Sequence, residues 1–464
     1  MKRRDFLKTS AAIAALNTLS PLAYARNVRK PRRVGVIGPG WYGKCDVLQL
    51  MNVEPVEVVT LCDPDSNMVN EAADLMAARQ QSGNRPKVFG DYRKMLANEQ
   101  HDIILVDSPD HWHALQMIAA VEAGADVYCQ KPTGCDVLES KAMLDAARRT
   151  NKIVQIGTQR RSTPHLIDAR EKVVKAGLLG EVAHAEVCCY FHMRRNSSIE
   201  ECPDKDPPKH LDWDMWTGPA PMRPYNDIVH PRGWRAFMEY GNGIMGDMCV
   251  HMLDTTRWML DLGWPKTRSS TGGIFVDKNS RANITDTQNA TFHFDDMDVV
   301  WTHRAWGNSA DEEYPWSAII YGTKGTLKLS VNKYDFIPRG GGKKLSGRAV
   351  AETDKYPTDK KDKDKWALEL HVASAIRGHM ADFLTAVDER SKPVADIEEG
   401  HISSASCIMA NVAMDLGRTL HWDPATHTVK GDDEATSRLK RDYRAPWEHP
   451  GLTAAVKLPL KAAG

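Results

Sequence analysis

One stretch decides the fold of this 464-residue chain: Val34-Gly35-Val36-Ile37-Gly38-Pro39-Gly40-Trp41-Tyr42-Gly43. An apolar run leads directly into glycines at Gly38, Gly40 and Gly43, and a helix-like pattern follows. The first glycine permits a tight turn, the second lets a pyrophosphate approach the backbone, and the third lets the helix pack on the strand. N–H groups at the helix start then face the phosphates. The stretch therefore predicts a dinucleotide-binding turn, with contacts from these glycines, Trp41 and Tyr42.

An acidic residue follows at the spacing that such a unit requires. The second apolar run, Val56–Cys62, ends in Asp63, twenty residues after Gly43. A carboxylate here accepts hydrogen bonds from the ribose 2′-hydroxyl and repels a 2′-phosphate. We therefore expect NAD as the cofactor and disfavour NADP. The alternative is a loop that merely contains glycines, and the agreement of spacing, flanking elements and acid argues against it.

The composition is that of a globular protein without a strongly charged partner. Hydrophobic residues make up 42% and charged residues 26%, and 61 Lys and Arg balance 61 Asp and Glu. This balance leaves no basic stripe for nucleic acid and no polybasic face for a membrane surface. The nine cysteines lack paired spacing, so we expect neither a disulfide framework nor a zinc module.

Residues 1–25 look like a twin-arginine export signal rather than part of the fold. Arg3 and Arg4 precede a weakly apolar stretch, and Ala23-Tyr24-Ala25 makes an A-x-A cleavage site. The stretch is too short and too polar to span a bilayer stably. We therefore expect the twin-arginine export machinery as a partner, a periplasmic mature protein and no membrane contact after cleavage. A basic disordered N-terminus is the alternative.

Residues 26–157 alternate short apolar runs with helix-like runs, a pattern typical of a doubly wound parallel sheet covered on both faces. We predict an α/β Rossmann domain that binds NAD, with strands at 34–37, 56–62, 103–107, 125–129 and 153–156. Ligands bind beyond the carboxyl ends of such strands. Further cofactor contacts are therefore expected where strands end, from Ser108, Pro109, His113 and Lys131.

Residues 158–423 carry alternating strands rich in Val, Ile, Thr and aromatics. They predict an α+β domain with a large, mostly antiparallel open sheet, whose strands are expected at 181–192, 268–276, 288–294, 299–304, 317–321 and 325–331. An insertion at 196–240 is too long for a plain loop and predicts a functional wall or lid.

Four later segments complete the chain. Alternating Asp and Lys at 355–365 predict a solvated loop. Helices are expected at 366–389 and 398–420, and residues 424–464 are interpreted as a C-terminal surface tail.

Asp247, His251 and Asp254 fall on one face of a predicted helix, at positions i, i+4 and i+7. The residues between them are apolar, so the three form a thin polar stripe on an otherwise buried rod. Ionisable groups on such a stripe must line a cavity or pair with one another. Lys131 ends an apolar strand at the carboxyl edge of the parallel sheet, at the mouth of the expected nicotinamide crevice.

These residue types suit hydride transfer from a secondary alcohol. His251 titrates near neutrality and can take the hydroxyl proton, Asp247 can orient the imidazole or stabilise its charged form, and Lys131 can stabilise the developing alkoxide. Two alternatives stay open. Asp247 caps the helix while His251 is a core histidine, or the pair binds a metal. Because no further ligands stand nearby in sequence, we expect no metal.

Other candidates for substrate contact lie elsewhere. Arg160 or Arg161, after the last parallel strand, could hydrogen-bond sugar hydroxyls, and a plain surface role is the alternative. The insertion carries Trp213, Trp216, Trp234 and Arg235, which could form an apolar platform for a sugar ring. Packing of the tryptophans in a core is the equal alternative. The expected substrate-binding residues are thus Arg160, Trp234, Arg235, Asp247 and His251.

Taken together, the motifs resemble those of the Gfo/Idh/MocA family of glucose-fructose oxidoreductase, inositol dehydrogenase and a rhizopine catabolism protein. They are the glycine turn and residues 108–113, 130–132, 216–221 and 246–254. The resemblance implies a Rossmann domain, then an α/β domain whose sheet often serves oligomerisation. It implies Lys131, Asp247 and His251 as catalytic residues and often a cis bond before Pro132. One departure is Gln130, where the family usually has Glu.

The resemblance implies an NAD(P)-dependent oxidoreductase acting on a secondary hydroxyl of a sugar, sugar derivative or cyclitol. Because the periplasm has no replenished NAD pool, we expect the cofactor to be bound in the cell and retained. One alternative is a redox-neutral glycoside hydrolase or lyase that works through a transient keto-sugar. Another is a non-catalytic sugar or nucleotide sensor, against which the intact Lys131, Asp247 and His251 argue. We expect a dimer or tetramer formed through the antiparallel sheet.

Overall fold

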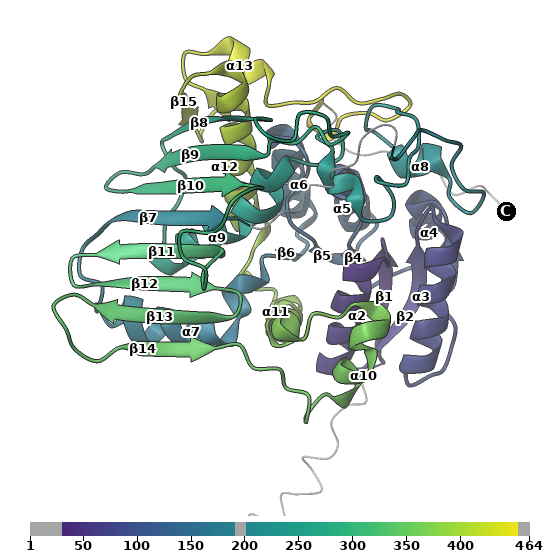
Figure 1. Ribbon diagram of the computed structural model, residues 1–464. Helices are drawn as coiled ribbons and strands as arrows, with labels where there is room; N and C mark the ends of the chain where they lie inside the picture. Colours follow the sequence, from purple (N-terminus) through teal and green to yellow (C-terminus); the bar gives the residue numbers. More distant parts are fainter. Residues whose placement is uncertain (1–29, 191–200, 453–464) are drawn as a thin grey trace, which may run out of the picture. The chain divides into compact units, whose positions relative to one another are not determined.

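The glycine-rich stretch folds as a strand, a turn and a helix. The computed structural model describes residues 30–190 and 201–452, so the predicted signal 1–25 lies outside the described residues. Strand β1 (Arg32–Ile37) enters the turn and helix α2 (Trp41–Val53) leaves it (Figure 1). Gly38 has a φ of +81°, and a Cβ there would lie 2.5 Å from the backbone nitrogen of Ser108. Only glycine fits this close approach.

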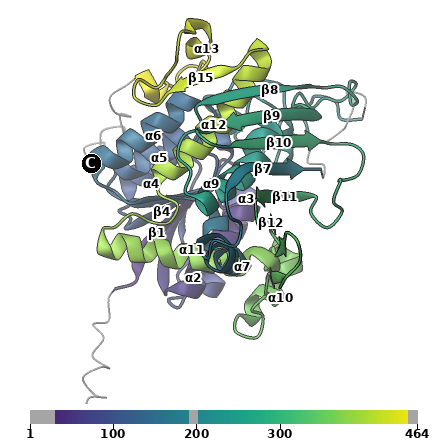
Figure 2. The ribbon, with the colours of Figure 1, turned by 90° about the vertical axis from the view of Figure 1, so that its left-hand side faces the viewer.

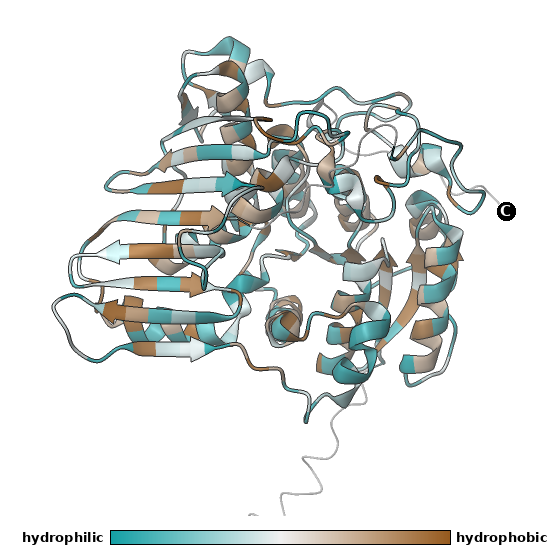
Figure 3. Ribbon diagram, in the orientation of Figure 1, coloured by the Kyte–Doolittle hydropathy of each residue, from teal (hydrophilic) through white to brown (hydrophobic). Residues whose placement is uncertain are grey.

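A six-stranded parallel sheet forms the first half of the fold. Its strand order is β3-β2-β1-β4-β5-β6, with β2 (Val56–Cys62), β3 (Lys87–Phe89), β4 (Ile103–Val106), β5 (Asp126–Cys129) and β6 (Val154–Ile156). Every residue of β4 and β5 is buried, and Figure 3 shows the central strands predominantly brown. Burial on both faces explains the continuous apolar runs. The predicted Rossmann fold is confirmed.

The helices that connect these strands carry the expected capping residues. They are α3 (Ser66–Arg79), α4 (Tyr92–Asn98), α5 (His113–Glu122) and α6 (Val137–Thr150). Asp65 caps α3, Asp91 caps α4, and Asp136 forms a capping box with Glu139 at α6. A carboxylate at this position satisfies backbone N–H groups that a helix start otherwise leaves unpaired.

A ten-stranded sheet forms the second half, in the order β14-β13-β12-β11-β7-β10-β9-β8-β15-β16. Its long strands are β7 (Val182–Cys189), β8 (Thr267–Gly273), β9 (Thr287–His293), β10 (Asp298–Arg304), β11 (Trp316–Gly322), β12 (Gly325–Ser330) and β13 (Lys333–Pro338), and β14 (Leu345–Arg348) is a shorter strand at one edge. Neighbouring strands pair antiparallel, except that β7 and β10 pair in parallel. The predicted mostly antiparallel open sheet is confirmed.

Helices cover one face of this sheet. Helices α7 (Pro164–Ala169), α9 (Val250–Leu260) and α12 (Ile397–Leu416) pack against its strands (Figures 1 and 2). Along β10, buried and half-buried residues alternate strictly, and Figure 3 shows colours that alternate along the long strands. This is the period of a sheet with one face in the core.

The structure differs from the prediction at residues 355–365, where a helix replaces the expected solvated loop. Helix α10 (Pro357–Trp366) buries Asp359, whose carboxylate accepts hydrogen bonds from Gln49 (2.9 Å) and Arg377 (2.7 Å). Buried partners far away in the sequence thus stabilise a segment whose composition alone favours solvent. The expected helices downstream are present as α11 (Leu370–Glu389) and α12.

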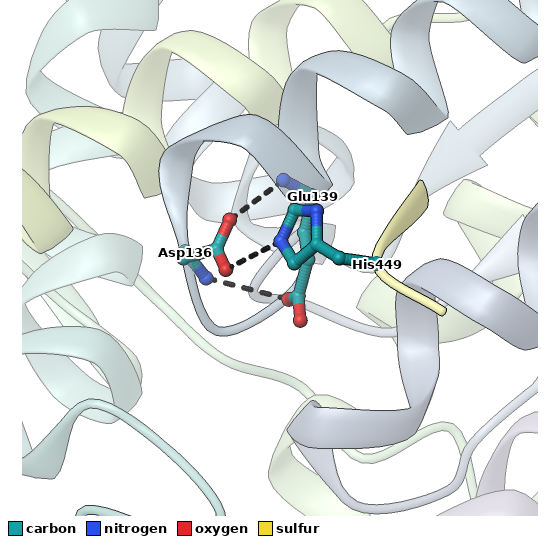
Figure 4. Close-up of side chains that lie close together, drawn as sticks. All are labelled: Asp136, Glu139 and His449. Atoms are coloured by element: carbon teal, nitrogen blue, oxygen red, sulfur yellow. Dashed lines mark hydrogen bonds and ion pairs between the residues drawn. The ribbon is translucent and has the colours of Figure 1, made fainter. Parts of the chain in front are cut away.

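The structure also differs from the predicted surface tail. Beyond β15 (Leu420–Asp423), the chain forms β16 (Thr428–Val429) and α13 (Asp433–Ser437). It then returns to helix α6, where Asp136 accepts a hydrogen bond from His449 (2.8 Å) and Tyr443 donates to Glu139 (2.5 Å) (Figure 4). Asp136, Glu139 and His449 lie close enough to hold a metal ion. Their carboxylates already cap α6, so we interpret the cluster as the fastening of the C-terminal segment.

None of the helices in the described part of the chain combines the length and the apolar character that crossing a bilayer demands.

Candidate active site

A first cavity lies where β1, β2 and β4 end. It is lined by seven of the residues expected at the cofactor: Gly38, Gly40, Trp41, Tyr42, Asp63, Ser108 and Pro109. Gly43 lies beneath the turn, where a Cβ would stand 2.5 Å from the Gly38 carbonyl oxygen. The carboxyl edge of the parallel sheet therefore brings the predicted cofactor residues together.

This cavity has the donors and the acid that a dinucleotide requires. Helix α2 starts after Gly40, and the described contacts include no side-chain cap and no acidic residue in its first turn. Its backbone N–H groups are thus available to a pyrophosphate. Asp63 lines the same cavity, and burial raises its pKa to about 7. Its carboxyl group still accepts the N–H of Asp65 at 2.9 Å, so the residues fit the ribose as well as the phosphates.

The cavity is roofed by two segments from distant parts of the sequence. His230, Pro231, Arg232 and Trp234 come from the insertion, and Lys365, Trp366 and Ala367 follow from the end of α10. The Trp41 indole N–H donates to the Ala367 carbonyl oxygen at 2.7 Å, and the Arg232 guanidinium lies 3.7 Å from the Trp41 ring centroid. The described part of the insertion, 201–240, thus forms a wall of this cavity.

The tryptophans expected as a sugar platform lie elsewhere. Trp213 and Trp216 stack on each other, with ring centroids 4.9 Å apart, inside an apolar cluster of the insertion. Trp216 and Trp234 line the first cavity. The alternative of core packing is therefore the better description of this group, and Trp234 lies beside the cofactor cavity rather than the substrate cavity.

A second cavity, of about 430 Å³, adjoins the first and shares Trp41, Tyr42, Asp107, Ser108, Arg232 and Arg235 with it. Most of the other residues predicted for cofactor binding, substrate binding or catalysis line this second cavity: His113, Lys131, Arg160, Asp247 and His251. Strand ends of the Rossmann sheet supply the first three, and helix α9 with its preceding π-helical turn, Met245–Cys249, supplies the last two. The structure thus assembles one site from both domains.

Lys131 and Asp247 form a largely buried ion pair that lines the second cavity. The Lys131 ammonium lies 2.5 Å from the Asp247 carboxylate and donates to its carbonyl oxygen at 3.1 Å. Arg235 approaches the same carboxylate at 3.6 Å. Burial would raise the pKa of Asp247, but these two positive charges hold it below its ordinary value. The Lys131–Pro132 bond is cis.

His251 presents a neutral imidazole to the second cavity. Burial lowers its pKa well below the ordinary value, and the charges of Lys131 and Arg160 lower it further. Its Nδ1 has no hydrogen-bond partner among the described residues, and its ring contacts Trp316 edge-on at 5.4 Å. This nitrogen is buried, so the part of the neutral ring that lines the cavity is what can accept a proton from a bound molecule. The expected orienting contact differs, because the Asp247 carboxylate bonds to Lys131 instead.

Asp254 and Arg161 form an ion pair with each other and do not line either cavity. The Arg161 guanidinium binds both carboxylate oxygens of Asp254, at 2.9 and 2.8 Å, and also reaches Glu399 at 3.0 Å. Both side chains are buried. The two arginines therefore have different places, since Arg161 stabilises the interior and Arg160 lines the cavity.

Family models match nearly the whole described chain. The model described as "Oxidoreductase family, NAD-binding Rossmann fold" matches residues 32–158. The model described as "Oxidoreductase family, C-terminal alpha/beta domain" matches residues 165–328 and 353–449, which is more than half of the chain. The chain belongs to the Gfo/Idh/MocA oxidoreductase family. Its first domain is accordingly an NAD-binding Rossmann domain.

Relatives and solved structures agree with this assignment. A "Glycosyl hydrolase family 109 protein" from Shewanella baltica is 30% identical over 222 residues, which are 42% of this chain and 46% of that protein. The chain thus spans about half the length of this curated relative.

Two solved structures share the fold, and each match covers 84% of this chain and 99% of the other chain. Myo-inositol 2-dehydrogenase from Lactobacillus plantarum has 19% identity and a TM-score of 0.58. Levoglucosan dehydrogenase in complex with NADH and levoglucosan has 16% identity and a TM-score of 0.61.

The departure from the family pattern at Gln130 has a local explanation. The Gln130 amide donates to the buried carboxyl group of Asp46 at 2.6 Å. Burial raises the pKa of Asp46 to about 7 and also raises that of its neighbour Asp107. A glutamate at 130 would add a third buried carboxyl group here. The Gln130 amide instead supplies a hydrogen-bond donor. The acidic group beside the strand that leads to Lys131 is therefore Asp46, which belongs to α2.

His113, which was expected at the cofactor, and its neighbour His111 lie in different surroundings. The ring nitrogens of His113 lie 2.8 Å from the carbonyl oxygens of Pro132 and Ser108, so His113 joins the loops that follow β4 and β5. His111 is buried against Trp216 and Tyr240. His113 thus fixes the loop that carries Lys131, and His111 packs in the interior.

Sequence reasoning missed the far wall of the second cavity. Its residues come from the ten-stranded sheet and the start of α11: Glu313, Trp316, Asn332, Glu369 and His371. Nothing in their local patterns distinguishes them from ordinary strand and loop residues. Only the packing of the second domain on the first brings them to the site.

Proposed function

We propose that this protein is an NAD-dependent oxidoreductase that oxidises a secondary hydroxyl group of a sugar, sugar derivative or cyclitol. One observation carries the proposal. The neutral, unpartnered imidazole of His251 shares a cavity with the Lys131 ammonium, and this cavity adjoins the dinucleotide cavity. A proton acceptor and a cation for a developing alkoxide therefore flank the place where a substrate would meet the nicotinamide.

The residues divide the reaction between them. NAD, when bound, supplies the hydride acceptor. The His251 imidazole, which lines the second cavity, would take the hydroxyl proton of the carbon that is oxidised to a ketone. Lys131 donates a hydrogen bond to the alkoxide, and Asp247 holds the ammonium in place. Trp316 packs against His251 and limits water at the imidazole. His251 returns its proton to solvent before the next cycle.

Cofactor choice and retention follow from the first cavity. The carboxyl group of Asp63 favours a ribose 2′-hydroxyl over a 2′-phosphate, so NAD is proposed in preference to NADP. The wall from the insertion and residues 365–367 line the cavity that would hold the dinucleotide. We propose that the cofactor stays bound through the cycle, after export of the folded protein to the periplasm by the twin-arginine machinery, and that a second substrate with a carbonyl group would take the hydride back and regenerate NAD. Purified protein should release NAD on denaturation, and a cofactor-free preparation from periplasm would contradict retention.

A second candidate function is supported by the curated relatives. They are named glycosyl hydrolase family 109 proteins, and the same residues suit a redox-neutral scheme. Transient oxidation acidifies a neighbouring C–H, a glycosidic group is eliminated, and the ketone is reduced again after water adds. Release of nitrophenol from a nitrophenyl glycoside, with no net change in cofactor absorbance, would select this scheme.

The test of the main proposal is the absorbance of the bound cofactor. Purified protein is mixed with a panel of sugars and cyclitols, and absorbance at the reduced-nicotinamide band is followed. We expect at least one compound to reduce the bound NAD. Binding of sugars without reduction or glycoside cleavage would instead indicate a sensor.

We also propose a homo-oligomer through the half-exposed face of the ten-stranded sheet. Exposed apolar side chains occur on its strands, including Tyr321 and Ile337. Light scattering should give a mass of two or four chains. A monomer at micromolar concentration would contradict this proposal.

A further inference from the structure

Arg160 is a buried cation that the proposed reaction does not use. It lies in the 3₁₀ turn Gln159–Ser162, directly after β6, and only 4% of its surface is exposed. Its Nε and Nη1 have no hydrogen-bond partner among the described residues. The guanidinium lines the second cavity and lies 5.3 Å from the Trp316 ring centroid.

The neighbouring charged side chains are occupied elsewhere. Lys131 and Arg235 share the Asp247 carboxylate, and Glu313 pairs with Lys333. Glu369 also lines the cavity, but its side chain is 39% exposed and it lies 4.0 Å from His371. Within the described residues Arg160 forms no ion pair. The charge of Glu369 acts on Arg160 without an ion pair between them, so the guanidinium lines the cavity with no hydrogen-bonded counter-ion among the described residues.

A buried guanidinium without a partner is costly, because desolvation of an ion removes several kcal/mol of hydration that nothing replaces. Burial accordingly lowers the pKa of Arg160. The planar guanidinium presents N–H groups in a fork that matches the two oxygens of a carboxylate. A hydroxyl group offers one neutral acceptor and leaves the charge uncompensated. A single positive charge also matches a monoanion better than a phosphate dianion.

Arg160 and His251 stand close enough to act on one small molecule. Both contact the same indole, that of Trp316, and both line the same cavity. The charge of Arg160 also acts on the His251 ring. A monosaccharide can therefore present one hydroxyl group to His251 and Lys131 and another substituent to Arg160.

We infer that the substrate is an acidic sugar, whose carboxylate binds Arg160 while a ring hydroxyl group faces His251. This inference rests on the proposed oxidoreductase function and narrows its substrate class to uronic, aldonic or related carboxylated sugars. The carboxylate supplies the missing counter-charge, and the Trp316 indole gives an apolar face for the ring. Arg160 is then the residue that determines specificity.

The test compares each acid with a neutral compound of the same shape. Glucuronate and galacturonate are offered to the purified holoprotein beside their methyl esters, glucose and galactose, and reduction of the bound cofactor is followed. We expect kcat/KM for one acid to exceed that for its methyl ester at least 100-fold. Equal values for acid and ester, or reduction by the neutral sugars alone, would overturn the inference and leave the oxidoreductase proposal standing. If no sugar reduces the cofactor, the proposed function itself fails.

Two variants assign the preference to Arg160. In Arg160→Met the ratio of acid to ester should fall toward one, and in Arg160→Lys it should keep an intermediate value. Glu369→Gln removes the nearby carboxylate and should leave the acid preference above 10-fold. If the preference survives Arg160→Met, the carboxylate is bound elsewhere and the inference is wrong. If Arg160→Met does not fold, the acid-to-ester ratio of the unmodified protein, measured at low and high salt, decides. A ratio of at least 100 supports the inference, and a ratio near one overturns it.

Discussion

Asp247 serves Lys131 rather than His251, and this changes what each residue contributes. A carboxylate that pairs with the histidine would raise its pKa, whereas the observed arrangement leaves the ring under the positive charges of Lys131 and Arg160. The imidazole therefore stays neutral well below its usual titration range. At neutral pH the imidazole is therefore in the form that can accept a proton.

Replacing Lys131 by Met should affect the rate and its pH dependence separately. We expect kcat to fall about 10²- to 10³-fold, because a donor to the alkoxide is lost. The loss of a nearby positive charge should raise the pKa of His251, so the acidic limb of the pH–rate profile should move to higher pH. Steady-state rates between pH 4 and 9 provide the measurement. An acidic limb that stays in place would contradict the electrostatic coupling of the two residues.

Gln130 provides a second test at this scale. In Gln130→Glu, burial beside Asp46 and Asp107 should raise the pKa of the new carboxyl group above its unfolded value of about 4.3. Below its unfolded pKa the new carboxyl group is protonated in both the folded and the unfolded protein, so it costs little stability. As pH rises from there through the raised folded pKa, the loss of unfolding free energy grows. We expect a loss of ~1–3 kcal/mol in unfolding free energy at pH 8 and little at pH 4. Thermal unfolding across this range measures it.

The matched control exchanges donor and acceptor. Adding Asp46→Asn to Gln130→Glu restores an amide–carboxyl pair at the same place and should recover most of the stability at pH 8. A double variant no more stable than Gln130→Glu would show that the hydrogen bond at 2.6 Å is not what the glutamine contributes.

Single residues also mark the limit of what the sequence predicts. Lys131, Asp247 and His251 stand in recognisable local patterns, so their place could be predicted. Trp316 and Glu313 have no such pattern, because their role depends on how β11 and the loop before it face the Rossmann domain. The contact that joins Asp247 to Lys131 depends on residues 116 positions apart in the sequence and had no local signal either.

Helix α10 shows the same limit for a whole element. Its alternating charges are typical of solvated segments, yet Asp359 and Asp362 are buried against α2, α3 and α11 through Gln49, Arg79 and Arg377. These partners are separated from the helix by up to 310 positions. The end of α10 then delivers Trp366 and Ala367 to the cofactor cavity.

If this element closes the cofactor cavity, shortening Trp366 should release the dinucleotide faster. In Trp366→Ala the contact between Lys44 and the indole, at 5.1 Å, disappears. We expect the NAD dissociation rate to rise about tenfold, which corresponds to about 1.4 kcal/mol. The measurement is the loss of bound cofactor after rapid gel filtration. Trp306→Ala, a change of the same kind at an exposed site, serves as control, and equal rates in both variants would contradict the role of α10.

At the scale of the molecule, the two halves were predictable to different degrees. Parallel strands buried on both faces give short apolar runs, so five strands of the Rossmann half followed from local pattern, whereas the short and partly exposed edge strand β3 did not. The strands of the second sheet were largely found as well, but β13, β14 and the C-terminal elements were not. Their weak patterns are stabilised by distant partners, as when His449 binds Asp136 across 313 positions.

The two cavities give the molecule its proposed function only in combination. Trp41, Tyr42, Asp107 and Ser108 belong to both, so a dinucleotide in one and a sugar in the other would meet at these residues. Helix α9 brings the base from the second domain, and the strand ends of the first bring the cation. Catalysis should therefore depend on the docking of the two domains as well as on either set of residues.

The most direct test of this account is the rate at which bound NAD is reduced in a single turnover by His251→Asn. The account predicts a loss of about 10²- to 10⁴-fold, with the cofactor content unchanged, while the control His184→Asn on the exposed face of β7 reduces its NAD at the unmodified rate. Reduction of bound NAD by His251→Asn at the unmodified rate would contradict the assignment of His251 as the proton acceptor.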